Sequence, residues 1–173
     1  MRAFSRVRRA GCTAALLVAC AHASERGAAG EAAPASSVRE EIERELDDLH
    51  DAAAKADEVR YFAHFAPDGV FLGTDASERW DVAAFRAYAH PHFARGKAWS
   101  FRGLKRRIAA RGDVAWFEED LETQNLGPAR GSGVLLRSGS RWLIAQYVLS
   151  IPIPNERFRE VRELLTSPSR ASP

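Results

Sequence analysis

The stretch Phe65–Trp80, FAPDGVFLGTDASERW, decides how the chain folds. Pro67 and Gly69 disfavour helix, and the apolar residues after them predict a short strand over residues 70–72. Gly73 then begins a tight polar connection that ends at the tryptophan. No nucleophile motif, phosphate loop or metal-ligand spacing accompanies this stretch. Its residues therefore indicate a fold rather than a reaction.

Helical patterns lie on both sides of this stretch. Residues 37–40, Ser-Val-Arg-Glu, fit a capping box, and apolar residues then recur every three or four positions, at Val38, Ile42, Leu46, Leu49 and Ala53. Asp57 is placed to cap a second, short helix, and Asp81 a third. We expect Pro91 to kink or shorten that third helix near its end.

The second half of the sequence predicts an antiparallel sheet. Four strands are expected, over residues 98–108, 113–122, 131–137 and 141–151. Pro152 and Pro154 end the last strand, and Asn155 is placed to cap a final helix with Phe158, Val161 and Leu165 facing inward. Helices followed by a run of strands predict an α+β fold with the helices packed on one sheet face.

The N-terminus has the pattern of an export signal over residues 1–23. An arginine-rich start precedes an apolar run that is too short to span a bilayer. Leu17 to Cys20 resembles a bacterial lipobox, which predicts a cut before Cys20, a lipid on that cysteine and a cell-envelope lipoprotein. A cut after Ala23 would instead release a soluble periplasmic or secreted protein. Residues 24–36 are then a flexible tether, residues 37–166 the domain, and residues 167–173 a frayed tail.

Charge and cysteine content exclude several function classes. Five of the 25 basic residues and two of the 23 acidic ones precede Val38, which leaves 20 basic and 21 acidic residues for the rest. A nearly neutral domain gives no support to nucleic-acid binding. Both cysteines, Cys12 and Cys20, lie in the export signal, so we expect no disulfide and no cysteine chemistry in the domain.

Four segments together resemble a known family. They are FAPDGVFLGTDASERW, DVAWFEEDLE, RGSGVLL and RWLIAQYVLSIPIPN, and they resemble the SnoaL-like branch of the nuclear transport factor 2-like (NTF2-like) superfamily over about residues 45–155. The resemblance implies a cone, in which helices pack on a strongly curved, mostly antiparallel sheet and enclose a pocket. FLGTDASERW resembles the first short hairpin of the family, which lies near the mouth of the cone.

The same resemblance counts against two chemistries. Ketosteroid isomerases of this superfamily carry a catalytic carboxylate where this chain has Gly73 or Thr74, and a tyrosine near Leu49, beside His50. Kinase association domains carry a His-x-His-x-Ser pattern on the last strand, which matches residues 146–150 here with both histidines replaced. We therefore expect neither isomerase chemistry nor a catalytic histidine on that strand.

Glu118 is the first candidate for acid–base chemistry, with His50 assisting. A carboxyl against the indole of Trp116 in a dry pocket would suit proton transfer, whereas Glu118 could equally be a solvated strand residue. Arg130 could hold a ligand carboxylate or be a solvated loop residue. The predicted ligand-binding residues are Phe71, Trp80, Trp99, Trp116, Arg130 and Gln146. The spacing of the histidines predicts no metal site, and no cofactor is expected.

Strand alternation also predicts a partner surface. Leu143, Ala145, Tyr147 and Leu149 would form an apolar row on the outer sheet face, and such a row needs a cover. The family that the chain resembles often dimerises through this face, which implies a homodimer as the cover; the final helix could cover it instead. The leading hypothesis is an exported domain that binds a small, partly apolar organic molecule. The alternatives are an enzyme of proton-transfer or hydrolytic type using Glu118, and a dimerisation or protein-docking module with a vestigial pocket. A membrane contact is expected only through a lipid on Cys20.

Overall fold

The computed structural model describes residues 36–167. The predicted export signal lies outside the described residues, as do the tether up to residue 35 and the tail after Ser167. No helix within residues 36–167 combines the length and the apolar character needed to cross a bilayer.

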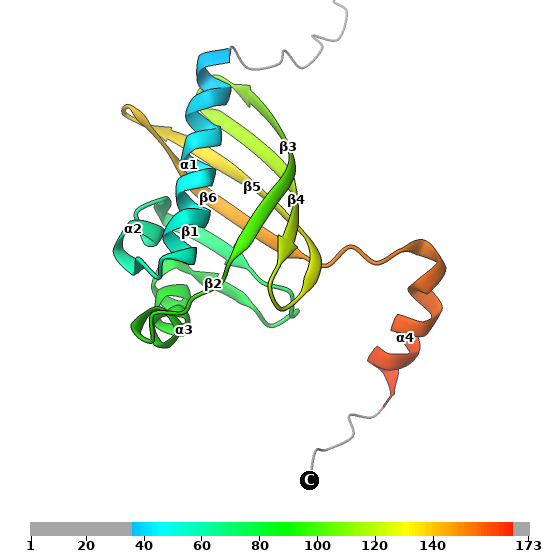
Figure 1. The fold of residues 1–173 in the computed structure, drawn as a ribbon. Coiled ribbons are helices and arrows are strands. Elements are labelled where there is room, and N and C mark those ends of the chain that lie inside the picture. Colours follow the sequence, from blue (N-terminus) through cyan, green and yellow to red (C-terminus); the bar gives the residue numbers. More distant parts are fainter. Residues whose placement is uncertain (1–35, 168–173) are drawn as a thin grey trace, which may run out of the picture. The chain divides into compact units, whose positions relative to one another are not determined.

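Residues 36–167 form four α-helices, one 3₁₀ turn and a six-stranded sheet. Its elements are α1 (Ser36–Ala54), α2 (Glu58–Phe62), β1 (Phe65–Leu72), β2 (Arg79–Asp81), α3 (Val82–Ala94), β3 (Phe101–Arg111), β4 (Val114–Thr123), β5 (Gly127–Ser138), β6 (Arg141–Ser150), the 3₁₀ turn η1 (Asn155–Arg157) and α4 (Phe158–Thr166). The strand order is β2-β1-β6-β5-β4-β3, in which β1 and β6 run parallel and the other neighbours antiparallel. α1 lies along one face of the curved sheet, with α2 and α3 at one end (Figure 1). The predicted α+β fold is confirmed.

The predicted helix caps are present at the second and third helices. The Asp57 carboxylate accepts a hydrogen bond from the Arg60 amide at 3.1 Å, and the Asp81 carboxylate accepts one from the Ala84 amide at 2.8 Å. Pro91 lies inside α3, which nevertheless continues to Ala94. The buried Phe93 ring contacts aromatic neighbours from α2, and this packing stabilises the last turn of α3 beyond the proline.

β6 changes the face that it buries part-way along its length. Ile144 pairs with Leu135 and Gln146 pairs with Val134, so Ala145 is left unpaired as a β-bulge. Side chains at even positions, Trp142 and Ile144, are buried before the bulge, and those at odd positions, Tyr147 and Leu149, are buried after it.

The predicted outer row of Leu143, Ala145, Tyr147 and Leu149 is therefore wrong as a surface. The bulge at Ala145 turns Tyr147 and Leu149 into the interior, and Gln146 is exposed instead. A homodimer through the outer face of the sheet stays a prediction, without that row to support it.

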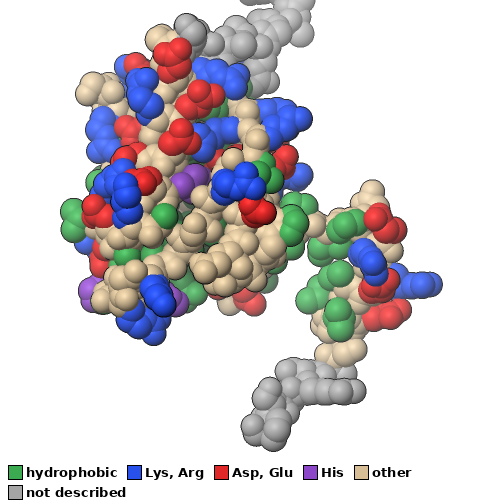
Figure 2. Space-filling model, viewed as in Figure 1, with side chains coloured by type: hydrophobic (Ala, Val, Ile, Leu, Met, Phe, Trp, Pro, Cys, Tyr) green, Lys and Arg blue, Asp and Glu red, His purple; other side chains and the backbone are tan. Residues whose placement is uncertain are grey.

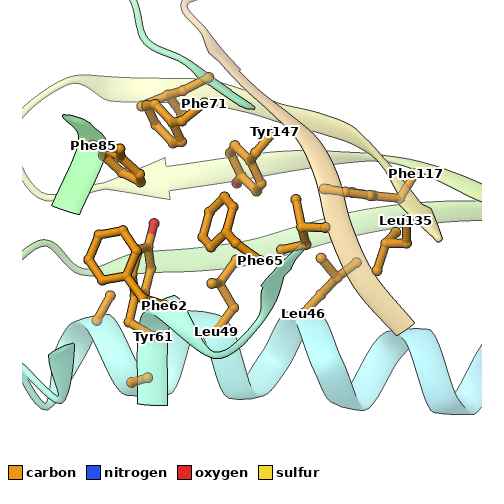
Figure 3. Close-up of a cluster of buried hydrophobic side chains, with 14 of the residues drawn as sticks. Leu46, Leu49, Tyr61, Phe62, Phe65, Phe71, Phe85, Phe117, Leu135 and Tyr147 are labelled. Carbon is orange, nitrogen blue, oxygen red and sulfur yellow. The ribbon is translucent and has the colours of Figure 1, made fainter. Parts of the chain in front are cut away.

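The space between α1 and the sheet is filled by a hydrophobic core rich in aromatic residues. Figure 3 shows Tyr61 and Phe62 from α2, with Phe65 and Phe71 from β1, gathered above α1. Phe85 from α3 completes this cluster, and neighbouring ring centroids in it lie 4.0–6.2 Å apart, within the range of favourable aromatic pairs. This core fixes the aromatic side chains that line the site described next.

The final helix differs from its prediction. η1 and α4 show no side-chain cap from Asn155, and the apolar side chains of α4 are not buried: Phe158 is 54% exposed and Leu165 is 81% exposed. The expectation that Phe158, Val161 and Leu165 face inward is therefore wrong. The amphipathic spacing was present in the sequence, but amphipathicity says which face is apolar, not what covers it.

Candidate functional site

A cavity of about 240 Å³ opens between the β1–β2 hairpin, α3 and the turn between β4 and β5. Aromatic rings form a large part of its wall. We define the aromatic cavity by the six rings that line it, those of Phe71, Trp80, Phe85, Tyr88, Trp99 and Phe101. Leu126 and Leu149 add aliphatic wall, and the polar lining comes from Thr74, Glu78, Ser100, Thr123, Gln124 and Asn125.

Several rings of the aromatic cavity lie nearly parallel to one another. Phe71 and Phe85 are stacked with centroids 4.0 Å apart and planes 14° apart. Trp80 stacks on Tyr88 at 4.6 Å and 22°, and on Phe85 at 5.8 Å and 9°. Trp99 continues the series beside Phe85 at 6.0 Å and 21°. These rings cover part of one another's faces, and a face that is left open to the cavity can stack on a flat partner.

The β1–β2 hairpin supplies one carboxylate to this cavity. In the hairpin, Glu78 Oε2 accepts a hydrogen bond from the Asp75 amide at 3.2 Å, and the Gly73 amide donates to the Glu78 carbonyl at 2.8 Å. A Cβ on Gly73 would overlap the Glu78 carboxylate. The glycine is thus required here so that the carboxylate can lie against the backbone at the cavity wall.

A second polar feature lies deeper, between α1 and the sheet. We define the interior network as His50, Arg106, Glu119 and Tyr147. Glu119 Oε1 contacts His50 Nε2 at 2.7 Å and accepts from the Tyr147 hydroxyl at 3.4 Å. Arg106 donates through Nε to Glu119 Oε2 at 2.8 Å, and also bonds Asp47 and the Glu43 carbonyl. The side chain of Glu119 is 0% exposed.

The interior network holds Glu119 as a carboxylate. Burial alone would raise the pKa of Glu119, but the hydrogen bond from His50 and the charges of His50 and Arg106 outweigh it and leave the pKa below its ordinary value. Burial and the neighbouring Glu119 charge raise the pKa of the Tyr147 hydroxyl well above its ordinary value. Tyr147 is therefore a neutral donor, and the network is a satisfied ionic cluster.

One layer of aromatic rings separates the interior network from the aromatic cavity. The Tyr147 ring stacks on Phe71 at 5.6 Å and 5°, and the His50 ring meets the edge of Phe101 at 5.9 Å. Phe71 and Phe101 both line the cavity, whereas no member of the network is part of its lining. A ligand in the cavity would be one side chain away from His50.

The cavity contains three of the six side chains that the sequence predicted to bind a ligand. Phe71, Trp80 and Trp99 line the cavity. Gln146 does not, because the bulge at Ala145 exposes it on the other face of β6. Arg130 is exposed and lies 3.8 Å from Asp120, away from the cavity lining.

The face chosen on β4 was also the wrong one. Trp116 and Glu118 lie on the outer face of the sheet, where Glu118 is 53% exposed and forms an ion pair with Arg107 at 2.7 Å. The buried face carries Ala115, Phe117 and Glu119. Glu118 is solvated and is not part of the cavity lining. The prediction that it lies in the pocket as an acid or base is therefore wrong. His50, which was predicted to assist Glu118, is buried and contacts Glu119 instead.

Sequence analysis missed Glu119, Arg106 and Tyr147 as a group. One signal could have indicated Glu119, since its strand neighbours on the same face are the apolar Ala115, Phe117 and Leu121. A charged residue among buried neighbours needs a partner. Nothing in the local sequence identifies Arg106 as that partner, because β3 must pair with β4 in the observed register before the two side chains meet.

A more polar hollow of about 380 Å³ lies beside α1, around Glu45, Asp48, His64 and Arg141. His64 is buried and both of its ring nitrogens contact carboxylates, Nδ1 that of Glu45 at 2.8 Å and Nε2 that of Asp48 at 2.9 Å. Acidic and basic side chains are interspersed over the face that carries α1 (Figure 2). Within residues 36–167, no group of three or more histidine, cysteine or acidic side chains is arranged to hold a metal ion.

Comparison with known proteins gives a consistent result for the fold. Residues 42–154 match the family model described as a SnoaL-like domain. No curated protein matches the chain. An NTF2-like protein of unknown function from Pseudomonas putida KT2440 superposes with a TM-score of 0.61 and 17% identity, covering 70% of this chain and 92% of that one.

Two further solved structures carry suggested activities. A candidate aromatic ring hydroxylase from Novosphingobium aromaticivorans gives a TM-score of 0.60 at 16% identity, over 70% of this chain and 93% of that one. A candidate dehydratase of the NTF2-like family from Streptomyces avermitilis gives 0.59 at 11% identity, over 68% and 98%. At such identities the likeness establishes the NTF2-like cone and not an activity.

Proposed function

The chain belongs to the SnoaL-like domain family, and from this premise we propose that it binds a small, flat, mostly apolar organic molecule in the aromatic cavity. The observation that carries the proposal is the set of nearly parallel rings around Trp80. A flat ligand would bury its faces against these rings, and Gln124 and Asn125 would bond its polar edge. Ligand sites are typically apolar with a few placed polar groups, as here.

The size of the cavity limits the ligand. At about 240 Å³ it is smaller than the roughly 300–1,000 Å³ of sites that take drug-sized molecules. We therefore expect one or two fused rings with short substituents. Indole and 2-naphthol are suitable probes, with cyclohexanol as a non-planar comparison.

Trp80 and Trp116 form a matched pair for the test. Trp80 lines the cavity and Trp116 lies on the outer sheet face. With isothermal titration calorimetry, Trp80→Ala should weaken 2-naphthol binding by about tenfold or more, because it removes a stacking face. Trp116→Ala should leave it unchanged. Equal affinities in the two variants would overturn the assignment of the site.

Tyr88→Ala provides a second variant that the fold should tolerate. Tyr88 is 48% exposed, so its removal should change stability little, and its ring stacks on Trp80. Weaker binding in this variant would arise from the cavity itself. Unchanged binding of 2-naphthol in both Trp80→Ala and Tyr88→Ala would place the ligand elsewhere.

A second candidate function is proton transfer on a bound substrate, favoured by the contact between His50 and Glu119. A buried carboxylate that contacts one ring nitrogen of a histidine orients the ring, so that its other nitrogen can take part in proton transfer, as in general-base pairs. This replaces Glu118 by Glu119 as the carboxylate of the enzyme hypothesis. A substrate would have to contact His50 past Phe101, whose ring is in edge-to-face contact with the His50 ring.

Deuterium exchange at the carbon beside the carbonyl of 2-tetralone, followed by NMR in D₂O, would test this candidate. The base removes the proton to give an enolate, and solvent returns a deuteron. His50→Gln should abolish catalysed exchange while 2-tetralone still binds, and Glu118→Gln should exchange at the wild-type rate. Exchange that persists in His50→Gln would exclude the candidate.

We also propose, from residues 1–23 alone, that the protein is exported. The intact mass of the mature protein from its own cells decides between the two predicted cuts. A diacylglyceryl group on an N-terminal Cys20 would mean a lipoprotein, and a free N-terminal Ser24 a soluble one. An unprocessed Met1 would contradict export.

A further inference from the structure

The charge that the described residues bring to the lining of the aromatic cavity is of one sign. Glu78 is the charged residue of its lining, and no lysine, arginine or histidine from the described part of the chain joins it. The rest of the wall is aromatic, aliphatic or neutral polar. A ligand in this cavity would therefore meet a negatively charged side chain and, among the described residues, no positively charged one.

Glu78 also differs from most carboxylates of the domain in having no cationic partner. Glu45, Glu58 and Glu119 each form an ion pair, and even the exposed Glu118 is paired with Arg107. Within residues 36–167, Glu78 takes part in no ion pair, although it is half-buried. Its Oε2 accepts one amide hydrogen bond, from Asp75, which leaves Oε1 available.

The aromatic rings beside Glu78 add to this negative character. The face of an aromatic ring carries the negative part of its quadrupole, and indole attracts cations most strongly. Trp80, two residues after Glu78, stacks on Tyr88 at 4.6 Å, and both rings line the same cavity as the carboxylate. Carboxylate and ring faces therefore favour the same kind of ligand group.

We propose that the aromatic cavity selects small organic cations, namely amines or quaternary ammonium compounds that carry a flat apolar ring. The proposal rests on the proposed ligand-binding function and adds the charge of the ligand to it. Glu78 would pair with the cationic nitrogen while the rings around Trp80 enclose its methyl groups and the flat part. An anionic ligand would meet an unpaired carboxylate and be rejected.

Two probes of the same shape separate charge from size. Benzyltrimethylammonium and neopentylbenzene differ in one central atom, nitrogen in the cation and carbon in the neutral compound. We expect the cation to bind the wild-type protein at least tenfold more tightly by calorimetry, with a preference that falls as salt rises. Glu78→Gln should bring the two affinities to within about threefold, mainly by weakening the cation.

Two further variants control for indirect effects. Glu118→Gln removes an exposed carboxylate from the outer face and should leave the preference for the cation intact. Gly73→Ala keeps the charge of Glu78 but displaces its carboxylate, because the new Cβ would overlap it. It should reduce the preference without abolishing binding of the neutral probe. Circular dichroism of each variant verifies that it is folded.

The possible results separate selection for cations from ligand binding by the cavity. If neopentylbenzene binds as tightly as the cation, selection for cations is wrong and the aromatic site stands. If the preference survives in Glu78→Gln, Glu78 is not its source and the proposal fails. If neither probe binds, and 2-naphthol does not bind either, the ligand-binding function itself is refuted.

Discussion

The interior network and the aromatic cavity each contain a glutamate, and the two are used in opposite ways. Glu119 is fully enclosed and contacts His50, Arg106 and Tyr147. Glu78 is half-buried and has no ion pair among the described residues. A buried carboxylate with all its bonds made within the protein is needed by the charges around it, whereas one left at a cavity wall without a cation is free for a ligand. One aromatic layer thus separates the interior network from the proposed ligand site.

The largest effect expected on this comparison is that of removing the Glu119 charge. Glu119→Gln leaves Arg106 and His50 facing an amide in a buried site, which should lower the free energy of unfolding by about 3–5 kcal/mol. Glu118→Gln, one residue earlier on the outer face, should change it by less than about 0.5 kcal/mol. Urea denaturation of both variants at neutral pH measures these changes in the free energy of unfolding. Similar losses in the two would mean that Glu119 is solvated in the protein.

The contrast between these adjacent residues also marks how far the sequence determines the structure. Alternation along β4 predicted correctly that Glu118 and Glu119 lie on opposite faces. It did not say which face is inside, and the indole of Trp116 favoured the wrong choice. The decision depends on the neighbours Ala115, Phe117 and Leu121, whose burial comes from packing against other elements.

β6 shows a limit of a different kind. A period of two holds on each side of Ala145, and nothing in RWLIAQYVLS indicates that the phase changes there. The bulge is a property of the pairing with β5 and β1, so single-strand reasoning placed Tyr147 and Leu149 on the wrong face. The β1–β2 hairpin, by contrast, is a local structure. Its turn residues predicted a strand followed by a tight connection, and the resemblance to the family's first hairpin implied that Phe71 and Trp80 lie at the pocket, where both line the cavity.

A smaller effect is expected from crowding the interior network without changing its charge. A Cβ on Gly131 would overlap the Tyr147 hydroxyl and lie 3.2 Å from Glu119 Cγ, so Gly131→Ala should cost about 1–3 kcal/mol. Gly103→Ala is the matched control, because its Cβ would lie at an ordinary 3.5 Å from Glu119 Oε2. Thermal unfolding of the two variants compares them. Equal midpoints would show that Tyr147 can move at little cost, and that the network is looser than its hydrogen bonds suggest.

The smallest expected effect is on the loss of stability in acid. It would distinguish the contribution of the interior network from that of the many surface carboxylates. The pKa of Glu119 in the folded protein lies below its ordinary value of 4.5, so the folded state holds that proton less readily than the unfolded chain. The stability that ionised Glu119 provides is therefore complete above pH 4.5 and is lost as the pH falls through the folded pKa.

Asp48 and Glu58 also have lowered pKa values and contribute in any variant that retains them. Between pH 7 and pH 3, Glu119→Gln should thus lose less of its free energy of unfolding than the wild type does, although it begins from a lower value. Urea titrations at a series of pH values give both curves, and parallel curves would mean that the acid sensitivity of the fold lies outside the interior network.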